Sequence, residues 1–163
     1  MKTVITKTDV YKFDELSDKA KNNAVEHLYD INVDYDWWDF LYKDAANIWL
    51  TITEFDAYYR HEINGKFEND AVTIARKIRE DHGKKTVTHR TAVKFLAAYR
   101  KLKKAEKEEL TNDDDMVTEF RHELLSDYLR MLREEYEYRT SREVIIETIE
   151  ANDYDFTIDG KLF

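Results

Sequence analysis

Histidines and carboxylates that could hold a metal ion are the first residues to consider for chemistry in this chain. His61-Glu62 and His122-Glu123 each begin like the helix of a zinc protease, but neither has the second histidine four residues after the first. The chain has five histidines and no cysteine, so thiolate ligands and cysteine nucleophiles are excluded. We therefore expect histidines on the surface or at helix ends, no metal site and no cofactor.

A second candidate for chemistry is the carboxylate-rich stretch around two tryptophans. Asp34, Asp36 and Asp39 alternate with aromatic residues and could supply the paired carboxylates and stacking rings of a glycosidase. We favour the alternative that the aspartates begin a helix, where the helix dipole stabilises negative charge, and that the rings face the core. Three serines and three dispersed glycines form no catalytic triad, phosphate-binding loop or nucleophile elbow. The sequence thus predicts that the protein is not an enzyme, and a hydrolase is the least favoured function.

The net charge of −9 is distributed unevenly along the chain. The segment from Arg76 to Lys104 has eleven Lys and Arg and two acidic residues, which gives +9, so the other 134 residues carry −18. An acidic protein as a whole is a poor binder of nucleic acid or anionic lipid. Only the basic segment could make such contacts locally.

The basic segment has the element order of a helix-turn-helix DNA-binding motif, although the turn from Gly83 to Thr88 is longer than in the compact motif. The alternative, which we favour, is that its cations lie on solvated helix faces or pair with the acidic remainder of the chain. The candidate nucleic-acid-binding residues are His89, Arg90, Lys94, Arg100 and Lys101.

Two clusters of carboxylates lie at the two ends of the longest expected helix and are candidates for an acidic protein-binding surface. The residues are Asp113, Asp114, Asp115, Glu134, Glu135 and Glu137.

Apolar spacing and the absence of proline predict a mainly helical chain. The longest helix, beginning near residue 113, should be the central core helix and bury Phe120, Leu124, Tyr128 and Leu132. Residues 51–67, which end in the turn signal Asn64-Gly65, could form either a strand pair or a short helix and a strand. The other expected helices span about residues 17–29, 36–50, 68–82, 88–110 and 141–151.

Local signals mark several helix ends and a terminal β element. Gly83 should supply a left-handed position after the helix that precedes it, and Thr140 with Glu143 matches a capping box. The β-branched run around Ile5 predicts a strand, and Asp159-Gly160 predicts a hairpin that joins it. The expected fold class is therefore α+β: a mainly α-helical single domain over 1–163, with a small antiparallel β element formed by the N- and C-terminal segments.

About half of the chain resembles a group of small acidic proteins from bacteriophages and mobile elements, some of them described as antitoxin-like. The matching parts are residues 11–21, 35–39, 44–45, and positions between 134 and 163. The centre, from about 53 to 110, departs from the group's pattern and contains the basic segment. The resemblance therefore assigns no functional residue.

Small acidic phage proteins often bind and block a host protein, and nucleases of bacterial immunity have large positive grooves that an acidic surface could occupy. The resemblance thus implies an inhibitor of a host nucleic-acid-binding defence protein, most plausibly an anti-CRISPR with a CRISPR effector nuclease as its partner. The alternative is a nucleic-acid-binding regulator or antitoxin that uses residues 76–104. We expect a cytoplasmic location in the bacterial host and no membrane contact, because no apolar stretch reaches the length of a signal or membrane segment. The oligomeric state stays open.

Overall fold

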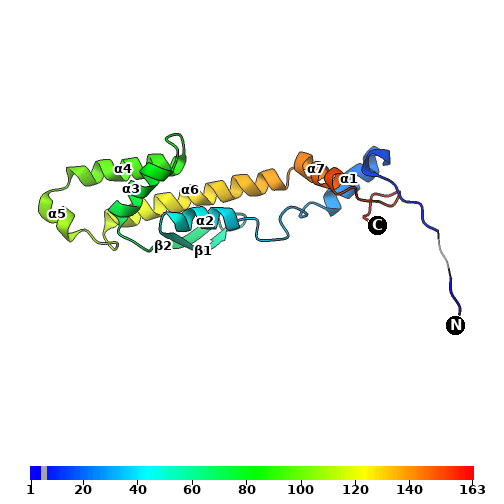
Figure 1. The fold of residues 1–163 in the computed structure, drawn as a ribbon, viewed down its shortest axis with the longest axis horizontal. Coiled ribbons are helices and arrows are strands. Elements are labelled where there is room, and N and C mark those ends of the chain that lie inside the picture. Colours follow the sequence, from blue (N-terminus) through cyan, green and yellow to red (C-terminus); the bar gives the residue numbers. More distant parts are fainter. Residues whose placement is uncertain (5–6) are drawn as a thin grey trace. The chain divides into compact units, whose positions relative to one another are not determined.

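The computed structural model describes residues 1–4 and 7–163, and within them the chain is mainly helical (Figure 1). It has seven α-helices, one short 3-10 helix and one two-stranded antiparallel sheet in this described part. Contacts divide the chain into two compact units. Unit 1 comprises Met1–Trp37 and Glu135–Phe163, and unit 2 comprises Trp38–Glu134.

Unit 2 contains the sheet and most of the helices. Its core forms around the longest helix, where the predicted stripe Phe120, Leu124, Tyr128 and Leu132 is buried, which confirms the central core helix. The ring of Phe95 stacks on Phe120 at a centroid distance of 4.3 Å. The elements are α2 (Asp39–Asn47), β1 (Leu50–Asp56), β2 (Glu62–Phe67), α3 (Ala71–Asp81), α4 (Val87–Lys101), α5 (Lys104–Glu109) and α6 (Asp115–Arg139), of which α6 continues into unit 1.

The β1–β2 hairpin decides between the two structures that the sequence left open for 51–67. Its turn lies between the strands at 57–61, where the Asp56 carboxylate accepts hydrogen bonds from the backbone of Tyr58 and Tyr59. The predicted turn at Asn64-Gly65 is wrong, because Gly65 lies inside β2, opposite Ile52. A Cβ at Gly65 would lie 2.6 Å from the Thr51 carbonyl oxygen, so this glycine permits close packing of the strands.

Helix ends follow the expected chemistry in some places and not in others. Ser17, Asp70 and Thr86 each accept a backbone hydrogen bond as N-caps of α1 (Asp18–His27), α3 and α4. The Thr140 capping box is wrong, because Ser141 is the N-cap of α7 (Arg142–Ala151) and the Thr140 hydroxyl donates to the Tyr136 carbonyl. Gly83 is not left-handed either, since α3 ends through an extended His82.

Unit 1 packs α1 against α7 around a small apolar core, together with a 3-10 helix, η1 (Phe13–Glu15), and the end of α6. The buried cluster is Phe13, Leu16, Ala20, Ala24, Val25, Ile145, Ile149 and Phe156.

The predicted sheet between the chain termini is not formed by the described residues. Tyr11 and Phe156 exchange backbone hydrogen bonds as an isolated bridge, and Phe156 makes a second bridge to Leu162. The C-terminal segment turns tightly at Gly160, whose φ is +85° and whose α-carbon packs against the Ala20 backbone. This turn against α1 replaces an extended hairpin. The expected strand residue Ile5 lies outside the described residues.

Candidate functional site

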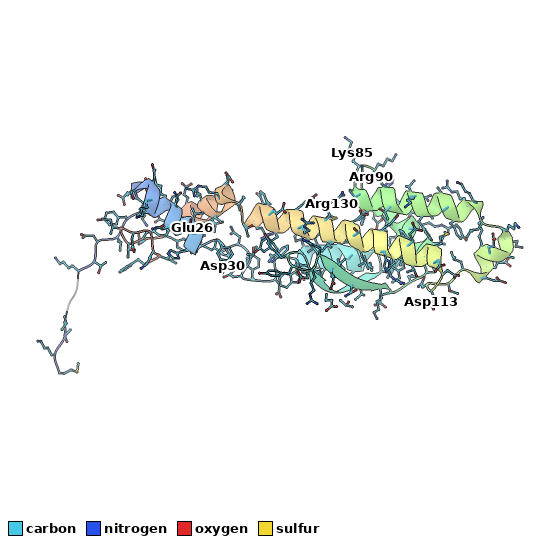
Figure 2. The ribbon with its side chains drawn as sticks, turned by 180° about the vertical axis from the view of Figure 1, so that it is seen from behind. Glu26, Asp30, Lys85, Arg90, Asp113 and Arg130 are labelled. Atoms are coloured by element: carbon cyan, nitrogen blue, oxygen red, sulfur yellow. The ribbon has the colours of Figure 1, made fainter. Side chains whose placement is uncertain are left out.

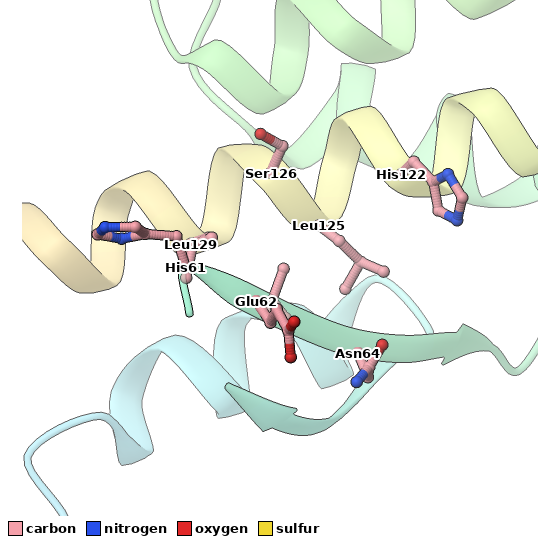
Figure 3. Close-up of a pocket in the computed structure, with 8 residues that line it drawn as sticks. His61, Glu62, Asn64, His122, Leu125, Ser126 and Leu129 are labelled. Carbon is pink, nitrogen blue, oxygen red and sulfur yellow. The ribbon is translucent and has the colours of Figure 1, made fainter. Parts of the chain in front are cut away.

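One hollow of unit 2 lies between β2 and α6 and is lined by two of the histidines singled out above (Figure 3). Its volume is about 510 Å³. His61 and His122 lie at opposite ends of the lining, and the Ser126 hydroxyl points away from β2. No cluster of three potential metal ligands occurs among residues 1–4 and 7–163.

A second group of polar side chains is largely buried in unit 2. The Tyr128 hydroxyl donates to Asp44 at 2.7 Å, and His82 Nε2 lies 3.9 Å from the other oxygen of that carboxylate. His82 Nδ1 is 2.7 Å from the hydroxyl of Thr88, which is only 2% exposed. Burial is the largest cause that raises the pKa of Tyr128, and the hydrogen bond to Asp44 is the second largest. These contacts join α2 to α6 through Asp44 and Tyr128, and the end of α3 to α4 through His82 and Thr88.

The predicted acidic cluster at the start of α6 is divided between two roles. The Asp114 carboxylate accepts hydrogen bonds from the Thr111 backbone and hydroxyl at 2.6 and 2.8 Å, which lowers the pKa of Asp114. It therefore shapes the entry into α6. Asp113 and Asp115 are exposed and make no ion pair within the described residues.

The carboxylates at the other end of α6 are also divided. Glu134 forms an exposed ion pair with Arg130 at 3.8 Å in unit 2. In unit 1, Glu135 accepts from Arg139 at 2.6 Å, whereas Glu137 is exposed. Residues 115 and 134 are 19 positions apart on one helix, or about 28 Å at 1.5 Å per residue. The two clusters are therefore not brought together into one acidic patch.

The candidate basic residues of α4 are also divided, because one of them is ion-paired and others are not. Lys94 pairs with Glu123 and lies 4.0 Å from Glu119, both on α6. It is therefore part of the contact between α4 and α6, as the alternative to nucleic-acid binding expected. Arg90, Arg100 and Lys101 are exposed and make no ion pair among the described residues, and His89 is half-buried.

The two units differ clearly in net charge. Unit 1 has sixteen carboxylates and eight Lys and Arg, which gives −8, whereas unit 2 has nineteen and eighteen, which gives −1. Four carboxylates of unit 1 form ion pairs, namely Glu135, Asp153, Asp155 and Asp159. Within the described part of the chain the other twelve have none.

Several of these unpaired carboxylates share one face of α7. Glu143, Glu147 and Glu150 are exposed, recur at spacings of four and three, and lie opposite the buried Ile145 and Ile149. Like charges at this spacing destabilise a helix by about 0.2–0.5 kcal/mol per pair. Figure 2 shows further carboxylates of this unit, Glu26 on α1 and Asp30 just after it.

A hollow of about 390 Å³ opens in unit 1 beside this face. Asp14, Glu150 and Asp153 give it an acidic lining, and Lys12 is its one cationic lining residue in the described part. The Lys12 ammonium is held by Asp153 and Asp155 at 3.1 and 2.8 Å. Asp14 and Glu150 make no ion pair among the described residues.

Sequence reasoning missed the acidic surface of unit 1 because its residues come from both ends of the chain. A count of charges over the two terminal segments together would have indicated this surface. Choosing those two segments required knowing that α1 and α7 pack in one unit.

Among the described residues, no helix combines the length and the apolar composition needed to cross a membrane. Comparisons of the chain with protein-family models, curated proteins and solved structures find no match.

Proposed function

We propose that the protein is an inhibitor that binds a host nucleic-acid-binding defence protein through the acidic surface of unit 1. The observation that carries the proposal is the charge asymmetry: unit 1 has −8 of the total −9. Carboxylates spaced along helices present negative charge much as phosphates do, and a groove lined with Lys and Arg attracts both.

The acidic surface is held on regular structure. Glu143, Glu147 and Glu150 project from a helix anchored by Ile145 and Ile149, which are 2% and 0% exposed. A rigid array of charges loses little conformational entropy on binding, so more of the electrostatic attraction contributes to affinity. The hollow beside Glu150 offers a place for a single Arg or Lys side chain of the partner.

The resemblance to phage proteins supports the choice of partner. Bacterial immune nucleases are the host proteins that a phage benefits from blocking, and their nucleic-acid grooves are positive. The proposed class is therefore anti-CRISPR-like, with a CRISPR effector nuclease as the partner.

The test starts with a pull-down from bacterial host lysate, with and without nuclease treatment. A protein partner survives the treatment, whereas a partner held through nucleic acid is lost. The captured protein, or a panel of purified CRISPR effector nucleases with guide RNA, is then assayed for cleavage of target DNA in the presence of the chain.

The decisive variant is Glu147→Lys with Glu150→Lys. Lysine near the C-terminus of α7 is favoured by the helix dipole, so this variant should fold at least as well as the wild type. We expect it to weaken inhibition by about tenfold or more, which corresponds to about 1.4 kcal/mol. The matched control, Glu108→Lys with Glu109→Lys, makes the same charge change at the end of α5 and should leave inhibition intact.

A third variant, Asp113→Lys with Asp115→Lys, tests the acidic cluster that the sequence alone predicted. If it abolishes inhibition while the α7 variant does not, the acidic contact lies at the start of α6 in unit 2. If no variant changes inhibition, the acidic mechanism itself is wrong.

A further inference from the structure

Most cations of the basic segment are left without a carboxylate partner. Of its eleven Lys and Arg, three form ion pairs: Lys77 with Asp81, Lys94 with Glu123, and Lys104 with Glu108. Among the described residues, the other eight make none. They are Arg76, Arg79, Lys84, Lys85, Arg90, Arg100, Lys101 and Lys103.

The unpaired cations fall into two groups. Arg76 lines a hollow together with Tyr99 and Lys107, so the start of α3 lies near the end of α4, where Arg100, Lys101 and Lys103 are found. Arg79, Lys84, Lys85 and Arg90 belong to the opposite end of the pair, in the last turn of α3, the turn between α3 and α4, and the first part of α4.

Arg130 of α6, which forms an exposed ion pair with Glu134, lies near the second group. Figure 2 shows Lys85, Arg90 and Arg130 in the same part of unit 2. Burial raises the pKa of Asp127, and a hydrogen bond from Thr91 and the charges of Arg130 and Arg90 counteract this rise only in part. Both arginines therefore lie close to one half-buried carboxylate, and the group combines residues from the turn, α4 and α6.

This group is not neutralised by its surroundings. Asp127 and Glu134 supply two negative charges against the four cations Lys84, Lys85, Arg90 and Arg130, so they offset only part of the positive charge. The pair between Arg130 and Glu134 is exposed on both sides, and such pairs contribute about 0–1 kcal/mol. The first turn of α4 contains no acidic residue.

We propose that Lys84, Lys85, Arg90 and Arg130 form a surface that binds the phosphate backbone of a nucleic acid duplex. Arginine forks and lysine ammonium groups are the side chains that hold phosphate oxygens. Because Lys94 is engaged by α6, the exposed side of α4 lacks one of the cations that a base-reading helix would use, and the contact is sequence-independent. This inference does not depend on the proposed function, because it concerns unit 2 and needs no protein partner.

The experiment measures binding of a fluorescein-labelled 20-base-pair DNA duplex to the full chain by anisotropy, between about 50 and 200 mM salt. The variant Lys85→Ala, Arg90→Ala, Arg130→Ala removes three charges of the proposed surface. Its matched control, Arg100→Ala, Lys101→Ala, Lys103→Ala, removes three charges from the other group of unpaired cations. Circular dichroism melts confirm that both variants are folded.

Each phosphate contact contributes about −0.9 to the slope of log K against log salt, so the first variant should flatten the slope by close to 3. We expect it to weaken binding at about 100 mM salt by at least tenfold, whereas the control changes affinity less than threefold. Equal losses in both variants would show that only overall charge matters and would overturn the proposed surface. No binding by the wild type at 50 mM salt would also overturn it, and would leave these cations to an acidic protein or an anionic membrane.

Discussion

The two units of the molecule contain similar chemistry but use their charges differently. In unit 2, cations and carboxylates are nearly equal in number, and the ion pair of Lys94 on α4 with Glu123 on α6 connects two helices. In unit 1, carboxylates outnumber cations two to one. Its long-range ion pairs join Lys12 to Asp153 and Asp155, near the chain ends, and leave the exposed face of α7 unpaired.

The comparison distinguishes charged side chains that stabilise the fold through ion pairs from charged side chains that have no ion-pair partner and can bind another molecule. A carboxylate already engaged by a lysine has given up part of its attraction for any other cation. The unpaired carboxylates of unit 1 cost stability through mutual repulsion, and a partner's positive surface would relieve that repulsion on binding. The same distinction applies within unit 2 on the single helix α4, where Lys94 is ion-paired and Arg90 makes no ion pair among the described residues.

The largest expected effect tests whether the two units have separate cores. Leu124→Ala removes a fully buried side chain of unit 2 and should lower the free energy of unfolding by about 2–5 kcal/mol. In urea titrations this appears as a lower midpoint. In native-state hydrogen exchange, the amides of α3 should lose protection and those of α1 should keep it. Equal losses in α1 and α3 would mean that the two units unfold as one.

In unit 1 the strongest expected effect comes from Gly160→Ala. Its φ of +85° costs a non-glycine residue about 1–3 kcal/mol, and the new Cβ would lie 2.1 Å from the Ala20 carbonyl oxygen. The matched control is Gly83→Ala, where the nearest atom is 3.8 Å away, and this variant should be neutral or more stable by up to about 1 kcal/mol. Thermal denaturation of both variants checks the difference. A neutral Gly160→Ala would show that the C-terminal turn does not rest on α1.

A smaller effect is expected from the buried hydrogen bond of unit 2. Tyr128→Phe keeps the ring in place and removes the hydroxyl that donates to Asp44, which should cost about 1–2 kcal/mol because the acceptor is charged and partly solvated. Tyr138→Phe, at an exposed position of α6 in unit 1, should change stability by less than about 0.5 kcal/mol. Chemical denaturation measures both. Similar losses of stability in the two variants would mean that the hydrogen bond from Tyr128 to Asp44 does not stabilise unit 2.

The features that could be predicted from the sequence are those set by local spacing. The α6 stripe through Phe120, Leu124 and Tyr128 repeats at helical intervals, and the cap at Ser17 depends on residues within one turn, so both predictions are confirmed. The same holds for the existence of α7.

The features that the sequence missed depend on distant parts of the chain. Asn64-Gly65 has the composition of a turn, but the glycine is there because Thr51 and Leu125 approach it closely. The terminal sheet was inferred from β-branched residues and a turn signal, whereas the position of Gly160 is set by its packing against α1. Likewise, the partner of Lys94 is Glu123 on α6, a distant residue that the basic segment itself does not indicate.

The smallest expected effect concerns pH and Asp127, a half-buried carboxylate of α6 that accepts a hydrogen bond from Thr91 on α4. Burial raises the pKa of Asp127 above its ordinary value of 3.8, so between 3.8 and the higher folded value the folded state binds more protons than the unfolded state. Stability therefore falls as pH rises through this window, and the loss persists at pH 7. Asp127→Asn keeps an acceptor for the Thr91 hydroxyl without the charge.

Asp127→Asn should accordingly have a slightly higher Tm than the wild type at pH 7, with the difference vanishing below about pH 3.8, the ordinary pKa of the group. Asp9→Asn, at an exposed position of unit 1 outside the helices and with no ion pair among the described residues, should leave Tm unchanged at neutral pH, because an unpaired solvated charge does not hold the fold together. Melting curves from pH 3 to pH 7 separate the two. A lower Tm for Asp127→Asn at pH 7 would mean that attraction to Arg90 and Arg130 outweighs burial. The arginines would then be held within unit 2 by Asp127, and less of their charge would be available to a phosphate backbone.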